Sequence, residues 1–309
     1  MQIGSRPIAL SGDRDDRRVT PAKAGAQCLA LLACAFILPA IAQLKIVATT
    51  AEMHSLASAV GGEAIAVSHL IPAGEDAESF QPRPQDLARI RAARAVLRVG
   101  VDYDLWLERL LRQAPGVVVI DASTDVALLD VRAGGVGPGD GHAHGRGNPH
   151  YWLDPANAEA ITGTILEALA ALDPPNARRY EANRLAFLAR LDAKMAQWSS
   201  ALRGAGALIA YHDTWPYFAR RFRLRFVGFI ETRPGIAPSA AHLADLLRIA
   251  KEEKVRAIVR EPHQPPRDAA FLAERTGARV AVLASGVGAV REAVDYISLI
   301  DYNVRALAP

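Results

Sequence analysis

Short β-rich runs alternate with helical patterns along this chain, and this alternation constrains the fold more than any other feature. Apolar runs bounded by turn residues predict strands, and apolar residues at helical spacing predict the helices between them. In the first half, the expected strands are Leu44–Ala48, Ile65–Ile71, Ala95–Val99 and Val117–Ile120, and the expected helices are Pro84–Arg94 and Tyr103–Gln113.

A helical stretch follows, in which apolar spacing predicts one helix near 161–172 and a long one over Asn176–Leu202. Strands and helices alternating on both sides of such a stretch predict an α/β fold of two lobes, each a mostly parallel sheet flanked by helices. In the second half, the expected strands are Ala207–Ala210, Arg225–Ile230, Arg256–Arg260 and Arg279–Leu283, and the expected helices lie near 213–222, 238–254 and 267–276.

This pattern divides the chain into four expected parts. They are a signal peptide at 1–43, an N-terminal lobe at 44–155 with a glycine- and histidine-bearing loop at 132–147, a helical segment with a linking helix at 156–203, and a C-terminal lobe at 204–309. Ligands of parallel sheets bind outside the carboxyl ends of the strands. Two such lobes facing one another therefore predict a ligand site in the cleft between them.

The N-terminal segment has the pattern of a secretory signal peptide. The apolar run Cys28–Ala42 is too short to span a membrane comfortably, basic residues precede it, and Ala40–Ala42 fits a cleavage site of small residues. We therefore expect export to the periplasm, from a start that could lie downstream of Met1. Anchoring as a lipoprotein through Cys34, or as an uncleaved segment, is the alternative.

Removal of residues 1–43 changes what the composition implies. The segment holds five basic and three acidic residues, so it supplies two of the formal +3 charges and leaves the rest of the chain close to neutral. The basic pI is then no argument for a nucleic-acid partner. Both cysteines are lost with the segment, so a transition-metal site would be built from histidine and carboxylate.

His150 is the most informative candidate for chemistry. Pro149 restricts the backbone before it, and Asp154-Pro155 is typical of the N-cap and first position of a helix. The imidazole is thus expected on a stiffened segment between the glycine-rich loop and a helix start. That position suits a metal ligand, although a packed, hydrogen-bonded histidine beside aromatic residues would show the same pattern.

The other candidates directly follow predicted strands or lie in the glycine-rich loop. Less specific interpretations stay open: a solvated turn for the carboxylates, a helix-start residue for His212 with Asp213 as the N-cap, and an exposed linker for the loop. The candidates after strands are Glu75, Asp76, Glu78, His212, Asp213 and Glu261, and those in the loop are Asp140, His142 and His144. The histidines expected to be structural or exposed are His54, His69, His242 and His263.

Eight short segments occur in an order and at spacings that characterise one protein family. The segments are Val47–Thr50, Ile71–Pro82, Asn148–Pro155, Tyr180–Asn183, Tyr211–Asp213, Pro234–Ser239, Glu261-Pro262 and Asp301–Asn303. In these segments the chain resembles the zinc/manganese-type periplasmic solute-binding proteins of bacterial ABC transporters, across essentially all of residues 44–309.

The resemblance implies two α/β lobes joined by a long rigid helix, with one metal ion in the cleft. In the family, the second, third and fifth segments each supply one histidine ligand, and a carboxylate near the C-terminus is often a further ligand. This chain keeps His150 and His212, but Asp76-Ala77-Glu78 stands where the first histidine is expected, and Leu283–Gly286 where the aspartate is expected. The implied ligand set is therefore Glu78, His150 and His212.

The resulting prediction is a periplasmic protein that captures a divalent metal ion and delivers it to the membrane permease of an ABC transporter. Two imidazoles and a carboxylate suit Zn²⁺, while the carboxylate makes Mn²⁺ more competitive than three imidazoles would. Asp76, Asp213 and Glu261 are additional candidates that could orient an imidazole. Asp140, His142 and His144 resemble the family's metal-gathering loop.

Two other functional classes stay open at this point. Two histidines and a glutamate with an open position also describe a zinc-dependent hydrolase, although the chain has no HExxH motif. An adhesin or receptor-like protein with a degraded metal site is the third possibility. The main prediction is a monomer with no catalytic residues and no nucleic-acid partner.

Overall fold

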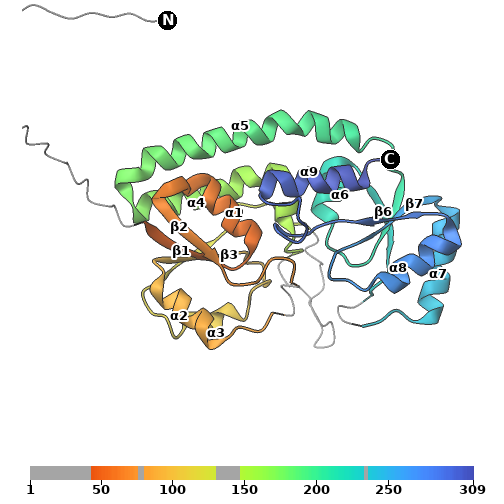
Figure 1. The fold of residues 1–309 in the computed structure, drawn as a ribbon, viewed down its shortest axis with the longest axis horizontal. Helices are drawn as coiled ribbons and strands as arrows, with labels where there is room; N and C mark the ends of the chain where they lie inside the picture. The colour runs from red at the N-terminus through yellow and green to blue at the C-terminus, as the bar shows by residue number, and fades with distance from the viewer. Residues whose placement is uncertain (1–42, 76–79, 130–146, 233–235) are drawn as a thin grey trace, which may run out of the picture. The chain divides into compact units, whose positions relative to one another are not determined.

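The computed structural model describes residues 43–75, 80–129, 147–232 and 236–309. Within them the chain forms two four-stranded sheets, and all strand pairs in both sheets are parallel. The strand orders are β2-β1-β3-β4 and β6-β5-β7-β8, so the two lobes repeat one topology (Figure 1). The predicted α/β fold of two mostly parallel lobes is confirmed.

The sheets are flanked by helices on both faces. The N-terminal lobe contains β1 (Leu44–Ala48), α1 (Ala51–Gly61), β2 (Ile65–His69), α2 (Pro84–Ala92), β3 (Ala95–Arg98), α3 (Leu107–Leu111) and β4 (Val118–Asp121). Helix α4 (Ala158–Leu172), from the helical segment, packs against α1 and β4 of this lobe. The C-terminal lobe contains β5 (Ala207–Ala210), α6 (Pro216–Phe222), β6 (Arg225–Phe229), α7 (Ala240–Glu252), β7 (Val255–Arg260), α8 (Pro266–Thr276), β8 (Arg279–Val282) and α9 (Tyr296–Leu307).

The central strands are buried on both faces, which explains their continuous apolar sequence. In β1, Ile46 and Ala48 belong to the large core that α1 and α4 cover, whereas Val47 packs on the other face beside residues of α2 and α3. The large core continues into the C-terminal lobe through residues of β5, α6 and α9. The hydrophobic effect therefore holds both lobes through one connected apolar interior.

Helix α5 (Ala177–Ala201) runs along both lobes, as predicted for the long linking helix (Figure 1). Toward its N-terminus, Asn183 Nδ2 donates to the carbonyl of Val60 in α1 at 2.9 Å. Toward its C-terminus, Lys194 Nζ and Trp198 Nε1 donate to the carboxylate of Asp301 in α9 at 2.9 and 2.6 Å. Its two halves are thus anchored to different parts of the fold.

Several local details differ from the sequence-based expectation. The helix predicted over Tyr103–Gln113 spans only Leu107–Leu111. His54 lies inside α1, a helix that was not predicted. Helix α9 was not predicted either. Helix α6 begins at Pro216 with Trp215 as its N-cap, so Asp213 does not cap it, because proline is favoured at the first helical position.

No helix in the part of the chain that the structure describes is both long and apolar enough to span a bilayer. The expected signal peptide lies outside the described residues.

Candidate metal centre

The topology gathers the candidate residues at the carboxyl ends of the strands. In each sheet the second and third strands along the chain lie on opposite sides of the first strand. Ligands of open α/β sheets bind in the crevice at this reversal of strand order. His212 follows β5, Glu231 follows β6 and Glu261 follows β7. Parallel pairing holds these ends together, since the Glu231 N–H donates to the Tyr211 carbonyl at 2.8 Å.

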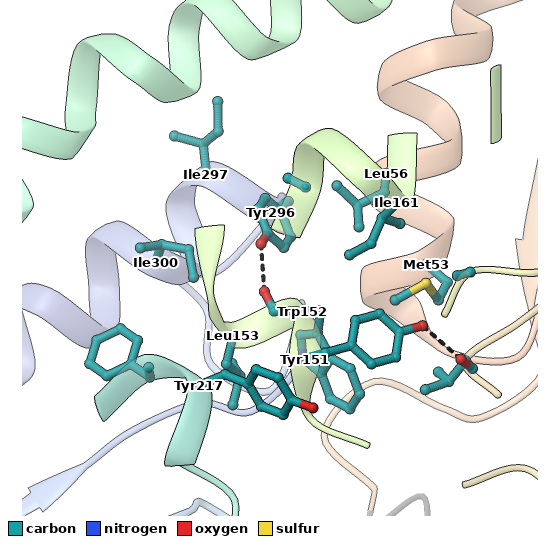
Figure 2. Packing of buried hydrophobic residues seen from close by; sticks show 14 of the residues in the cluster. Met53, Leu56, Tyr151, Trp152, Leu153, Ile161, Tyr217, Tyr296, Ile297 and Ile300 are labelled. Atoms are coloured by element: carbon teal, nitrogen blue, oxygen red, sulfur yellow. Dashed lines mark hydrogen bonds between the residues drawn. The ribbon is translucent and has the colours of Figure 1, made fainter. Parts of the chain in front are cut away.

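The segment that carries His150 is fixed by hydrogen bonds to both lobes. Tyr151 Oη donates to the Val99 carbonyl at 2.6 Å, and Trp152 Nε1 donates to the Ser285 carbonyl at 2.8 Å. Tyr296 Oη of α9 donates to the Trp152 carbonyl (Figure 2). Asp154 accepts from the Ala156 N–H, as expected for the cap of the turn at Pro155. The backbone around His150 is therefore held in one place.

Asn148 determines which nitrogen of His150 carries the hydrogen. Its Oδ1 accepts from the His150 backbone N–H at 3.0 Å, and its Nδ2 donates to the Asp213 carbonyl at 2.9 Å, so the two backbone groups fix the amide orientation. The same Oδ1 lies 3.1 Å from His150 Nδ1. Because an amide oxygen only accepts, Nδ1 carries the hydrogen and Nε2 carries the lone pair.

Glu231 fixes the tautomer of His212 in the same way as Asn148 fixes that of His150. Its Oε2 lies 2.9 Å from His212 Nδ1, so the carboxylate accepts from Nδ1–H and again leaves the lone pair on Nε2. A carboxylate behind an imidazole orients the ring and raises its basicity as a ligand. Both side chains are mostly buried, at 19% and 15% exposed, which strengthens this interaction.

The two imidazoles converge from different lobes. The ring centroids of His150 and His212 are 6.3 Å apart and the rings are nearly perpendicular, at 72°. Two imidazoles on one tetrahedral zinc ion have centroids roughly 5 Å apart, since each nitrogen lies about 2.0–2.1 Å from the metal. The pair is therefore slightly wider than a closed zinc site. Tyr103 and Trp152 flank the His150 ring at 5.6 and 5.3 Å between centroids.

The other predicted site residues have different environments. Glu261 is buried and accepts from Thr214 Oγ1 at 2.6 Å and from Gln264 Nε2 at 3.2 Å, while its Oε2 lies 4.0 Å from His263 Nδ1. The Asp213 carbonyl accepts from Asn148, as described above. Asp76, Glu78, Asp140, His142 and His144 lie outside the described residues. Within residues 43–75, 80–129, 147–232 and 236–309, no three His, Cys, Asp or Glu side chains are grouped to hold a metal ion.

A small pocket of about 40 Å³ lies beside this centre, between elements of both lobes. Glu52 and Glu75 line it from the N-terminal lobe, and His263 and Ser285 line it from the C-terminal lobe. Glu52 is 4% exposed, and burial raises its pKa from 4.5 to about 7. A Cβ on Gly286 would lie 3.0 Å from Glu52 Oε2, so the loop at Gly286 packs directly on this carboxyl group.

Sequence reasoning did not single out Glu231 or Glu52. Glu231 could have been found, because it directly follows a predicted strand, as His212 does, at the same edge of the sheet. Glu52 had no comparable signal, since its burial depends on α1 and on the loop at Gly286.

The comparisons with known proteins agree with the fold. The family model described as "Zinc-uptake complex component A periplasmic" matches residues 46–309. The high-affinity zinc uptake system protein ZnuA of Yersinia pestis is 26% identical over 298 residues, covering 88% of this chain and 93% of that protein. The zinc-binding lipoprotein AdcA of Streptococcus pneumoniae TIGR4 is 27% identical over 90% of this chain, which spans 58% of AdcA.

A solved structure described as the crystal structure of ZnuA superimposes with a TM-score of 0.75 at 28% identity, covering 86% of this chain and 99% of that one. The family match spans both lobes and the linking helix. The chain therefore belongs to the family of periplasmic component A proteins of zinc-uptake complexes.

Proposed function

We propose that this protein is a periplasmic binding protein that captures a divalent transition metal ion, Zn²⁺ ahead of Mn²⁺, and delivers it to the membrane permease of an ABC transporter. Membership of the zinc-uptake family supports the transport role over the hydrolase and adhesin alternatives. The zinc-binding names of ZnuA and AdcA support the choice of metal. We further propose that the chain acts as a monomer.

The observation that carries this proposal is the pair His150 and His212. The two rings come from different lobes, approach to 6.3 Å, and both hold hydrogen on Nδ1 through a fixed acceptor. A zinc ion in the cleft would receive one Nε2 donor from each of these two histidines. Metal bound there would also link the lobes.

Glu78 is the proposed third ligand. The resemblance implies that Glu78 stands where the family's first histidine is expected, and its carboxylate would bring one negative charge to the ion. A carboxylate in place of an imidazole hardens the donor set, which makes Mn²⁺ more competitive. We propose that Asp140, His142 and His144 gather metal without belonging to the tight site.

Zinc affinity of single variants tests the proposal. His150→Ala and His212→Ala should each weaken zinc binding far more than about tenfold, because each removes one of three protein donors. His242→Ala is the matched control, since His242 lies in α7 with its Nε2 on the Phe229 carbonyl. A competition titration with a chromophoric chelator measures the constants. Zinc binding of both variants at the parent's affinity would show that the site lies elsewhere.

A further inference from the structure

We propose that His54 and His69 form a second, weaker binding position for a borderline divalent metal ion such as Zn²⁺ or Cu²⁺, on the N-terminal lobe. The pair is distinct from His150 and His212 and does not depend on the ligand set proposed for the cleft.

The geometry of the pair fits a shared ion. His54 lies in α1 and His69 is the last residue of β2, and their ring centroids are 5.3 Å apart with an interplanar angle of 35°. Imidazoles that share a tetrahedral zinc ion have centroids roughly 5 Å apart, given Zn–N distances of about 2.0–2.1 Å. This separation is closer to that value than the 6.3 Å of the cleft pair.

The chemistry of the two rings also suits a metal. His69 Nδ1 lies 2.8 Å from the Ile71 carbonyl, and because a carbonyl only accepts, Nδ1 carries the hydrogen and Nε2 the lone pair. The His54 ring makes no hydrogen bond to any residue described in the structure, and its ring contact is the one with His69. His69 therefore offers Nε2, and the proposal assigns one ring nitrogen of His54 as the second donor.

The surroundings of His54 favour its neutral form. Burial, and then the neighbouring His69, lower the pKa of His54 below its usual value. A neutral imidazole can bind a metal ion without first losing a proton. The nearby guanidinium of Arg89, which donates to the His69 carbonyl, is paired with Asp86 at 3.5 Å. Its charge is thus partly offset.

The location relates the pair to the interlobe pocket. Ile71, whose carbonyl accepts from His69, lines that pocket together with Glu52 and Glu75. His54 and His69 are both partly exposed residues, so the pair is not sealed from solvent. With two protein donors completed by water, the position should bind more weakly than a three-donor site. Borderline ions that favour imidazole, above all Cu²⁺ and Zn²⁺, are the expected occupants.

The test counts zinc equivalents in the full chain by equilibrium dialysis. The background variant carries His142→Gln and His144→Gln, so that the glycine-rich loop contributes no histidine. We expect it to bind two equivalents, one tight and one weak. Adding His54→Gln or His69→Gln should abolish the weak equivalent and leave the tight one unchanged, whereas adding His242→Gln should leave both.

Circular dichroism checks that each variant is folded. Because His54 and His69 are substituted separately, a local folding defect in one variant would not by itself explain loss of the weak equivalent in both. A background variant that binds a single equivalent would overturn the proposal. So would a weak equivalent that survives both substitutions. If the proposed cleft site were wrong, the result would differ: the His142→Gln/His144→Gln background variant would lack the tight equivalent.

Discussion

At the scale of single residues, the cleft is organised by the groups behind its two histidines. Asn148 and Glu231 accept from Nδ1 of His150 and His212, and both imidazoles therefore present Nε2 to the space between the lobes. Asn148 also donates to the Asp213 carbonyl beside His212. One amide thus couples the positions of both histidines.

Replacement of Asn148 should therefore weaken zinc binding without unfolding the protein. Asn148→Ala removes the acceptor that fixes the His150 tautomer, and loss of such a partner costs about 10–100-fold in metal affinity. Asn148→Asp keeps an acceptor and should retain part of that affinity. Competition titration gives the constants, and long-range ¹H–¹⁵N spectra of the metal-free protein report the tautomer directly.

Asn183→Ala is the control for Asn148, because Asn183 likewise donates to a backbone carbonyl, that of Val60, but far from the histidines along the chain. Its zinc affinity should match the parent's. If His150 kept its Nδ1–H tautomer and full affinity in Asn148→Ala, the assigned role of the amide would be wrong.

Glu52 should make the stability of the fold depend on pH. Its folded pKa of about 7 lies above the unfolded value near 4.5, so the native state holds this proton more tightly. The associated stability is present below pH 4.5 and is lost as the pH rises toward 7. Glu52→Gln stays neutral, so it should be more stable than the parent at pH 8 by on the order of 1–3 kcal/mol.

Urea unfolding of metal-free parent and variant at pH 5 and pH 8 measures this difference. The advantage of Glu52→Gln should be small at pH 5 and full at pH 8. An equal difference at both values would mean that the carboxyl group titrates normally in the folded protein.

The roles of single residues were only partly predictable from sequence. His150 and His212 could be singled out because each lies at the end of an element whose sequence signals are local. Glu231 acts on His212 only because β5 and β6 pair in parallel, which is a contact between segments distant in sequence. Asn148 was part of a motif, but its double hydrogen bonding depends on the position of Asp213.

At the scale of elements, strands were more predictable than helices. Strands buried on both faces form continuous apolar runs, and most of the predicted bounds lie within two residues of the observed ones. Helix α1 was missed because seven of its eleven residues are buried, so its sequence lacks the polar face that marks an amphipathic helix. Its existence follows from packing against α4 and α5 rather than from a local pattern.

The contact between α5 and α9 should contribute to stability but not to metal binding. Trp198 is almost fully buried, and its indole N–H donates to Asp301 at 2.6 Å. Asp301→Ala leaves this donor without its acceptor, which should lower the free energy of unfolding by about 1–3 kcal/mol. Zinc affinity of the folded variant should be unchanged, because Asp301 contacts neither cleft histidine.

Glu253→Ala is the matched control for Asp301, since it breaks an exposed ion pair with Arg225. Such pairs contribute at most about 1 kcal/mol. Urea unfolding compares the two variants. Equal, negligible losses in both would contradict the importance assigned to the α5–α9 contact.

At the scale of the whole molecule, two lobes of one topology present the carboxyl ends of their strands to a shared centre. His150 belongs to a segment bonded to both lobes, and His212 follows the first strand of the second sheet. A metal ion held by both would bridge the lobes. The fold class could be predicted from alternation alone, whereas the distance between the histidines depends on how the lobes pack.

The crystal structure of the zinc-bound protein tests this account most directly. We predict one ion in the cleft, with Nε2 of His150 and Nε2 of His212 at about 2.0–2.1 Å and a carboxylate oxygen of Glu78 at about 2.0–2.2 Å. Asn148 and Glu231 should keep their bonds to the two Nδ1 atoms. A zinc ion bound through Nδ1, or held without either histidine, or with Glu78 turned away from it, would contradict the account.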